Sequence, residues 1–255
     1  MDELIARFRE YAASFKGADS VCDLNIDLKL EHTMRVLDET RSLCAAEGID
    51  ARLSRLAGFV ALLHDLSRFE QFKESGSFND AASFDHGDRS VELAARDGWV
   101  RELEHREAEA VLTAICWHNK LAVPGDLSPD AALLTRVIRD TDKLDIMRVL
   151  LDHFEHPEKN PAVVYSMDRN TRLTPAVAAA LAGGRQVDHR DMRTVADFTA
   201  ATLSWVYDLN FAWSRREFLR RGFIAAILKR LPQDELVSRA AARACSETFT
   251  ESVRM

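Results

Sequence analysis

Residues 53–69, LSRLAGFVALLHDLSRF, decide the fold class of this chain. Apolar residues recur there at helical spacing, at Leu53, Leu56, Ala57 and Val60. The same face ends in His64, and Asp65 follows directly. This period of 3.6 residues predicts a buried helix with a polar pair at its end. The apolar run is much shorter than the roughly 20 residues that a membrane-spanning helix needs.

The same period recurs in two later stretches, residues 107–118 and residues 134–145. Ser128 followed by Pro129 predicts the start of the second of these helices, because proline is favoured at the first helical position. No stretch of the sequence alternates like a strand between hairpin turns. The sequence therefore predicts an all-α protein.

The chain is predicted to divide near residue 155. Residues 1–155 would form a helical core, and residues 156–255 a helical extension that begins with a connection rich in proline and glycine. We expect residues 156–192 to act as a lid over the site. Residues 67–84 contain several turn formers and are predicted to be irregular.

Helix boundaries are also marked within the extension. The pair Thr174-Pro175 predicts a helix start, and Gly183 predicts its end. Ser214 and Glu217 form a capping-box pattern, which predicts a further helix that runs up to Pro232. The extension matches no chemical motif.

Composition limits the class of protein. The 255 residues include 34 Lys and Arg against 41 Asp and Glu, which gives a net charge of −7. This acidic balance argues against a protein that coats nucleic acid. None of the four cysteines forms a C-x-x-C pair, so neither a zinc ribbon nor a redox dithiol is indicated. The first residues are charged and amphipathic, unlike a signal peptide, and we expect a cytoplasmic protein.

Six titratable residues fall at helix-patterned positions in the first half of the chain: His32, His64, Asp65, His86, His118 and Asp142. A single histidine on an apolar face is more often a core residue than a ligand. Burying six such groups together without a cation would be very costly. Imidazoles with carboxylates, and no thiolate, suit Fe, Mn, Co, Ni or Zn rather than a structural zinc site or a pure magnesium site.

These residues resemble the HD-domain metal-dependent phosphohydrolase superfamily, and within it the HDIG-like subgroup. The segment HDLSRF at residues 64–69 looks like the family's H-D-I-G-R-F form, and FDHG at residues 84–87 looks like its D-H segment. The full order is H…HD…H…H…D, and the resemblance covers residues from about 28 to 150. It implies an HD-domain-like helical bundle with a C-terminal helical extension.

The resemblance also implies the ligands of two divalent transition metal ions. The set shared across the family matches His32, His64, Asp65 and Asp142. The extra ligands of members that hold two ions match His86 and His118. Asp65 would bridge the ions, because one carboxylate can give an oxygen to each of them.

The implied activity is hydrolysis of a small, nucleotide-like phosphoester by a hydroxide that the two ions activate, with Asp65 as a catalytic residue. Arg68 and Lys143 are candidates to neutralise the phosphoryl charge, although a surface salt bridge is an equal alternative for each. Asp85 has two candidate roles, as a helix cap or as a partner to a ligand imidazole.

Two other functions stay open at this point. Di-iron oxygenases similar to myo-inositol oxygenase use the same order of ligands. A non-catalytic helical binding module would keep the fold but lose metal binding or an accessible site. The expected partner is a small phosphorylated substrate, without a membrane and without stable nucleic-acid binding, and the oligomeric state is left open.

Overall fold

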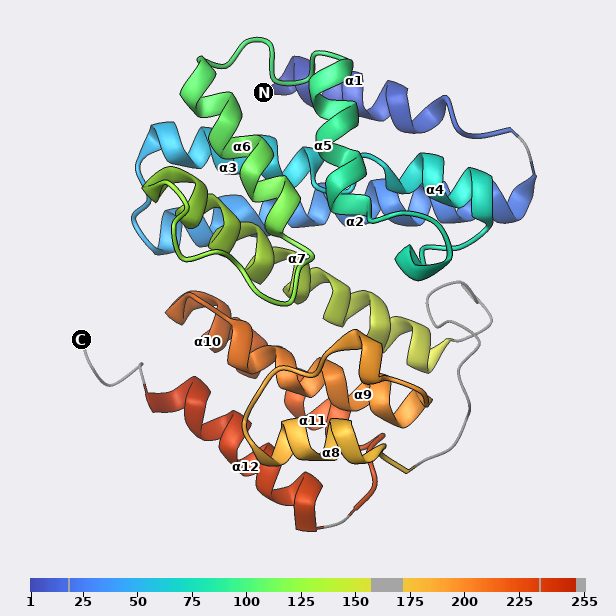
Figure 1. Ribbon diagram of the computed structural model, residues 1–255, viewed down its shortest axis with the longest axis vertical. Coiled ribbons are helices and arrows are strands. Elements are labelled where there is room, and N and C mark those ends of the chain that lie inside the picture. The colour runs from blue at the N-terminus through green and yellow to red at the C-terminus, as the bar shows by residue number, and fades with distance from the viewer. Residues whose placement is uncertain (18, 157–171, 234, 251–255) are drawn as a thin grey trace. The chain divides into compact units, whose positions relative to one another are not determined.

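The computed structural model describes residues 1–17, 19–156, 172–233 and 235–250. Every regular element within these residues is a helix, which confirms the predicted all-α class (Figure 1). The chain divides into two compact units, Met1–Tyr165 and Ser166–Met255. The predicted boundary near residue 155 and the predicted lid at residues 156–192 stay predictions, because residues 157–171 lie outside the described residues.

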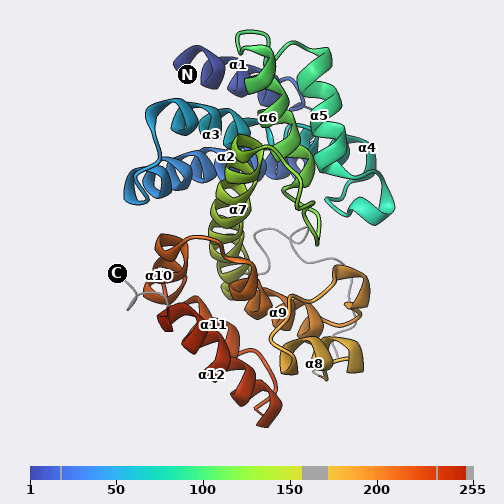
Figure 2. The same cartoon turned by 60° about the vertical axis from the view of Figure 1, so that its left-hand side comes forward.

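The first unit is built around helix α7. Its elements are α1 (Asp2–Ala13), α2 (Ser20–Ala46), α3 (Ala51–Leu63), α4 (Arg68–Ser75), the 3₁₀ turn η1 (Asp80–Ala82), α5 (His86–Arg96), α6 (His105–Trp117) and α7 (Pro129–Glu155). Helix α7 packs against α2, α3 and α6, while α2 also contacts α3 and α4, and α5 packs on α6 (Figures 1 and 2). The four helices α2, α3, α6 and α7 therefore enclose one core.

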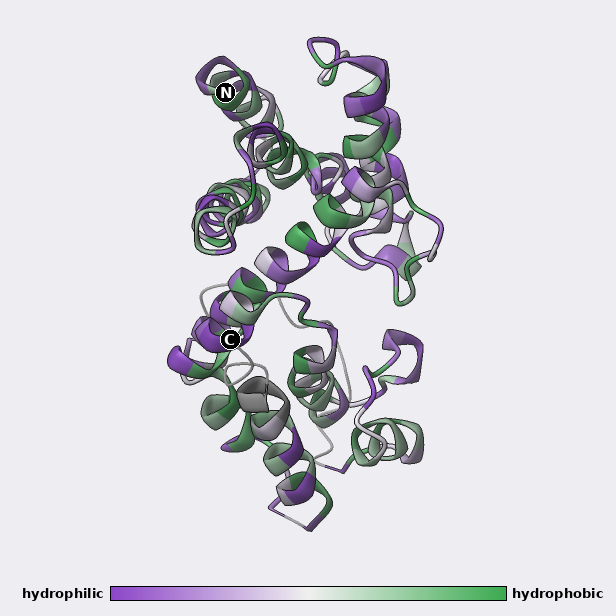
Figure 3. Ribbon diagram, turned by 90° about the vertical axis from the view of Figure 1, so that its left-hand side faces the viewer, coloured by the Kyte–Doolittle hydropathy of each residue, from purple (hydrophilic) through white to green (hydrophobic). Residues whose placement is uncertain are grey.

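Helix α3 supplies the most completely buried part of that core. Phe59, Val60 and Leu63 each expose 1% or less of their surface. Hydrophobic and hydrophilic residues are interleaved along the helices, as amphipathic packing requires (Figure 3). Because the core excludes water, polar side chains at its edge must find partners within the protein.

Side-chain caps mark the starts of several helices of this unit. Asp50 accepts a backbone hydrogen bond at the start of α3, and Ser128 does the same for α7, with Pro129 in its first turn as predicted. Asp85 caps α5 in the same way. These caps satisfy backbone donors that a helix start leaves unpaired.

The prediction that residues 67–84 are irregular is wrong for their first half, which forms helix α4. Phe69 and Phe72 are buried on one side of this helix, and the ring of Phe69 contacts that of Phe8 edge to face. The turn formers at Ser75 and Gly76 end the helix, with Gly76 in the left-handed conformation at φ 65°. The irregular connection is therefore confined to residues 76–85.

The second unit contains shorter helices. They are α8 (Pro175–Ala182), the 3₁₀ turn η2 (His189–Asp191), α9 (Val195–Ser204), the 3₁₀ turn η3 (Trp205–Asp208), α10 (Ala212–Arg220), α11 (Phe223–Leu228) and α12 (Glu235–Thr250). Helix α8 begins after Thr174 and ends at Gly183, as predicted. Helix α12 packs against α8, α10 and α11, so it organises this unit.

The predicted helix from Ser214 to Pro232 is wrong at its start and in its middle. Helix α10 begins at Ala212, and Ser214 lies buried within its first turn. Gly222 adopts φ 71° and separates α10 from α11. A capping box does occur in this unit, at the start of α9, where Thr194 and Asp197 bond to each other's backbone.

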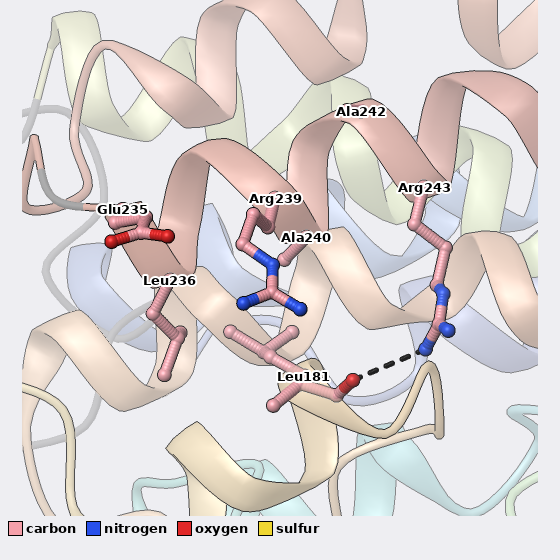
Figure 4. A pocket seen from close by; sticks show the side chains of 8 residues that line it. Leu181, Glu235, Leu236, Arg239, Ala240, Ala242 and Arg243 are labelled. Atoms are coloured by element: carbon pink, nitrogen blue, oxygen red, sulfur yellow. Dashed lines mark hydrogen bonds between the residues drawn. The ribbon is translucent and has the colours of Figure 1, made fainter.

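The second unit also holds a pocket of about 580 Å³ between α8 and α12 (Figure 4). Leu181, Arg239 and Arg243 line it, and the Arg243 guanidinium donates to the carbonyl of Ala182. Its lining residues include no histidine and a single carboxylate, Glu235. The pocket therefore lacks the side chains that would hold a transition metal.

Among the described residues, no helix combines the length and the apolar character needed to cross a membrane.

Candidate metal centre

The six predicted ligands converge in the first unit. They come from the interiors of α2 and α7, from the residues that follow α3 and α6, and from the first turn of α5. His32, His64, Asp65, His86 and His118 are buried, and the Asp142 side chain is 16% exposed. Their atoms form two groups joined by one carboxylate.

The first group consists of His32, His64 and Asp142. Oδ1 of Asp142 lies 3.1 Å from Nε2 of His32 and 3.6 Å from Nε2 of His64. These three atoms are buried and make no hydrogen bond. Unpaired buried polar atoms are rare in proteins and costly. One ligand atom from each residue lies within 4.8 Å of the others, so the group could hold a metal ion.

The second group consists of His86 and His118, whose Nε2 atoms lie 3.0 Å apart. The Asp65 carboxylate lies between the groups. Its Oδ1 is 3.6 Å from Nε2 of His86, and its Oδ2 is 3.6 Å from Nε2 of His64. His64, Asp65 and His118 also offer ligand atoms within 4.8 Å of one another. A carboxylate in this position can give one oxygen to each group.

Each of the four imidazoles is held through its Nδ1 atom. The Nδ1 partners are the Asp145 carboxylate for His32 at 2.7 Å, the Ala61 carbonyl for His64 at 2.8 Å, the Asp80 carboxylate for His86 at 2.6 Å and the Ile115 carbonyl for His118 at 2.6 Å. When Nδ1 carries the proton and donates it to these oxygens, Nε2 keeps its lone pair. All four Nε2 lone pairs are then available at the centre.

In this tautomer, two imidazole nitrogens face each other with no proton between them. With Nδ1 protonated in both rings, the Nε2 lone pairs of His86 and His118 would face each other at 3.0 Å. Two facing lone pairs repel unless a cation or a shared proton lies between them. The donor set therefore fits a bound metal ion.

Asp145 and Asp80, which hold two of the imidazoles, were not singled out from the sequence. Asp145 also pairs with the Arg35 guanidinium at 2.6 and 3.0 Å. It lies one turn after Asp142 on the same apolar stripe of α7, which was a usable signal. Asp80 lies in η1, where no periodicity marks it.

Asp85 takes the first of its two predicted roles. Its carboxylate caps α5 and pairs with Lys120 at 2.6 Å, and it accepts from Asn119 at 3.0 Å. Burial by itself would raise the pKa of Asp85, but these donors hold the pKa at about 2. The carboxylate that holds an imidazole of this region is Asp80 instead.

The charge states of Asp65 and His118 suit metal binding. Burial by itself would raise the pKa of Asp65, but Lys29, His64 and Arg68 hold it well below its ordinary value. Burial, with His86 and His64 nearby, holds the pKa of His118 well below its ordinary value. Asp65 is thus ionised and His118 neutral near pH 7, as ligands require. Lys29, whose Nζ lies 2.6 Å from Oδ2 of Asp65, was missed from the sequence.

The two predicted cations occupy different surroundings. Arg68 is 12% exposed, and its Nε lies 3.4 Å from Oδ1 of Asp65. Lys143 is buried on α7, and its ammonium donates to the Arg139 carbonyl at 3.1 Å. Both side chains are largely buried rather than exposed at the surface. Of the two, Arg68 contacts a candidate ligand directly, and a role for either in catalysis stays a prediction.

The end of α6 is fixed by a buried arginine. Nη1 of Arg139 donates to the carbonyls of Trp117, His118 and Lys120. A helix end leaves carbonyls without partners, and a cation there stabilises them. Arg139 therefore holds the backbone of His118 against α7.

Comparison with known proteins gives one match. The family model described as "HD domain" matches residues 30–147, a range that contains all six candidate ligands. No curated protein and no solved structure matches the chain.

Proposed function

The chain belongs to the HD-domain superfamily through residues 30–147, and from that premise we propose that it is a phosphohydrolase that uses two divalent transition metal ions. HD domains are generally metal-dependent hydrolases, and the buried His and Asp groups of this chain could hold a metal. The proposed substrate is a small phosphoester, nucleotide-like in size and charge.

The observation that carries this proposal is the convergence of four Nε2 atoms and two carboxylates. His32, His64 and Asp142 would hold one ion, and His86 and His118 the other. Asp65 would give Oδ2 to the first and Oδ1 to the second, since each oxygen lies 3.6 Å from a histidine of its own group. Three unpaired buried atoms in the first group support occupancy by a cation.

The ions would supply a nucleophilic water at neutral pH and would neutralise the phosphoryl oxygens. The residues of the chain contribute orientation and charge. The Nδ1 acceptors of the four imidazoles keep the Nε2 atoms aimed at the centre. Lys29 and Arg68 place two positive charges beside Asp65, which favours an anionic substrate.

The first test is metal analysis of the purified protein, followed by a panel of phosphomonoesters and phosphodiesters with Mn²⁺, Fe²⁺ or Co²⁺. We expect two ions per chain and release of phosphate or of a phosphomonoester. The matched control is Arg89→Gln, since Arg89 lies on α5 and pairs with Glu70 and Glu92. It should retain both metal and activity.

The same assay separates the alternatives. Oxygen uptake that depends on an added substrate, with no phosphoester cleaved, would contradict hydrolysis and favour a di-iron oxygenase. Binding of one ion or none, with no cleavage across the panel, would favour a non-catalytic helical module.

A further inference from the structure

Both oxygens of Asp65 already have a cationic partner from the chain itself. Lys29 Nζ lies 2.6 Å from Oδ2, the oxygen that faces the first group. Arg68 Nε lies 3.4 Å from Oδ1, the oxygen that faces the second group. Any metal ion that binds Asp65 must therefore do so beside a positive side chain, at a cost that depends on how easily that side chain can move.

The two cations differ in how firmly they are held. Lys29 carries its charge on a flexible stem, and among the described residues its ammonium hydrogen-bonds to Asp65 alone. Arg68 is fixed by its Nη1 atom, which donates to Oδ1 of Asp80 and to the Phe78 carbonyl, both at 2.7 Å, and also to Gln71. The guanidinium cannot leave without releasing the connection of residues 76–85.

The fixed guanidinium lies at the second group. Nη2 of Arg68 is 3.4 Å from Nε2 of His86, and Nε of Arg68 is 3.4 Å from Oδ1 of Asp65. These are two of the atoms that would hold the second ion. The first group has Asp142 as a carboxylate of its own, whereas the second shares only Asp65. The ligand set of the second position therefore carries less negative charge, and the Arg68 guanidinium, which Asp80 holds and partly offsets, is its fixed positive neighbour.

We infer, resting on the proposed function, that Arg68 makes the second metal position dependent on an anion. An ion binds there weakly in the free protein. It binds tightly once a phosphoryl group lies beside Arg68, because the negative charge of that group offsets the charges of the guanidinium and of the ion. Because coupling between two ligands is reciprocal, the second ion also tightens the binding of the phosphoryl group. Binding of the substrate and binding of the second ion are thus coupled.

The test is a titration of the full-length, metal-stripped protein with Mn²⁺, in which free Mn²⁺ is counted by electron paramagnetic resonance. It is run without phosphate and with saturating inorganic phosphate. We expect one tight site and a second about tenfold or more weaker without phosphate. Phosphate should tighten the second site by roughly 5- to 150-fold, the usual range of such coupling, and leave the first nearly unchanged.

Three variants assign the effect. Arg68→Gln should tighten the second site without phosphate and abolish most of the phosphate effect. Arg68→Lys keeps the charge but places it on a flexible stem, and it should give an intermediate second site, tighter than in the wild type and less dependent on phosphate. Arg89→Gln removes a guanidinium that pairs with Glu70, away from the ligands, and should titrate like the wild type. In each variant, an unchanged affinity at the first site shows that the unit is folded.

Two equal sites in the wild type without phosphate would overturn the inference, while the two-metal proposal would stand. The inference also fails if Arg68→Gln keeps a weak, phosphate-dependent second site, because the charge of Arg68 would then not control the binding of the second ion. Failure to bind a second ion even with phosphate would instead count against the proposed function on which the inference rests.

Discussion

The two halves of the candidate metal centre are built differently. In the first, His32 and Asp142 project from the interiors of long helices, and His32 is held by Asp145, whose side chain is 1% exposed. In the second, His86 is held by Asp80, whose side chain is 31% exposed and lies in the connection of residues 76–85. Helix packing alone therefore assembles the first half, whereas the second half also needs a short irregular segment.

This difference predicts a difference in rigidity. Asp145 is clamped between His32 and the Arg35 guanidinium, and both partners lie on α2. Asp80 is held by Arg68 and Gln71 of α4. Preorganised ligands bind with less loss of conformational entropy, so the first half should bind its ion more tightly.

The largest effect is expected from Asp65→Ala, because this carboxylate lies between both halves. The variant should lose both ions and all activity above background, measured by metal analysis and by the phosphoester assay. Circular dichroism would check that the helices remain. Two ions retained in this variant would mean that Asp65 is not the bridge.

The next largest effects are expected from two variants that each change one half of the site. Asp142→Ala should abolish tight binding at the first position, because it removes a carboxylate oxygen 3.1 Å from Nε2 of His32. His118→Ala should lose the second ion and keep the first. Metal stoichiometry after dialysis measures both. Equal losses in the two variants would show that the halves do not bind separately.

Sequence periodicity predicts much of the first half of the site. His64 and Asp142 lie on apolar stripes, so the pattern that predicts their helices also predicts that they point inward. Asp145 lies on the same stripe as Asp142 and could have been named as a partner for an imidazole. Buried positions on regular helices are predictable because the helical period relates sequence to direction.

The irregular parts of the site were not predictable in the same way. Asp80 reaches His86 through a connection whose path depends on Arg68 and Gln71, and no period relates these residues. Lys29 was missed because its contact with Asp65 joins α2 to the turn that follows α3, far along the sequence. Helix α4 was missed because the turn formers near Gly76 outweighed the two buried phenylalanines before them.

A smaller effect is expected at the carboxylates that hold the imidazoles. Asp145→Asn should weaken the first position, and Asp80→Asn the second, each by about 10- to 100-fold in metal affinity, as is usual for such partners. Calorimetric titration with Mn²⁺ measures both affinities. If both variants weaken the same position, the two halves have been assigned incorrectly.

The smallest effect is expected from Asp85, which lies next to His86 but serves its helix rather than its ring. Asp85→Ala should cost about 1 kcal/mol in the free energy of unfolding through loss of the cap, with unchanged metal affinity. Asp85→Asn is the matched variant, since asparagine caps a helix comparably while the charge paired with Lys120 is lost.

The pH dependence of the stability difference between the wild type and Asp85→Asn separates the contribution of the helix cap from that of the charge. The pKa of Asp85 is about 2 in the folded protein, below its ordinary value of 3.8, so the stability that its charge contributes is present above about pH 4. That contribution is lost as the pH falls through the folded value. The stability difference between wild type and Asp85→Asn should therefore shrink between about pH 4 and pH 2, measured by denaturant unfolding. A pH-independent difference in stability would mean that the charge of Asp85 does not stabilise the fold. Weakened metal binding in either variant would place Asp85 among the residues that hold the second half.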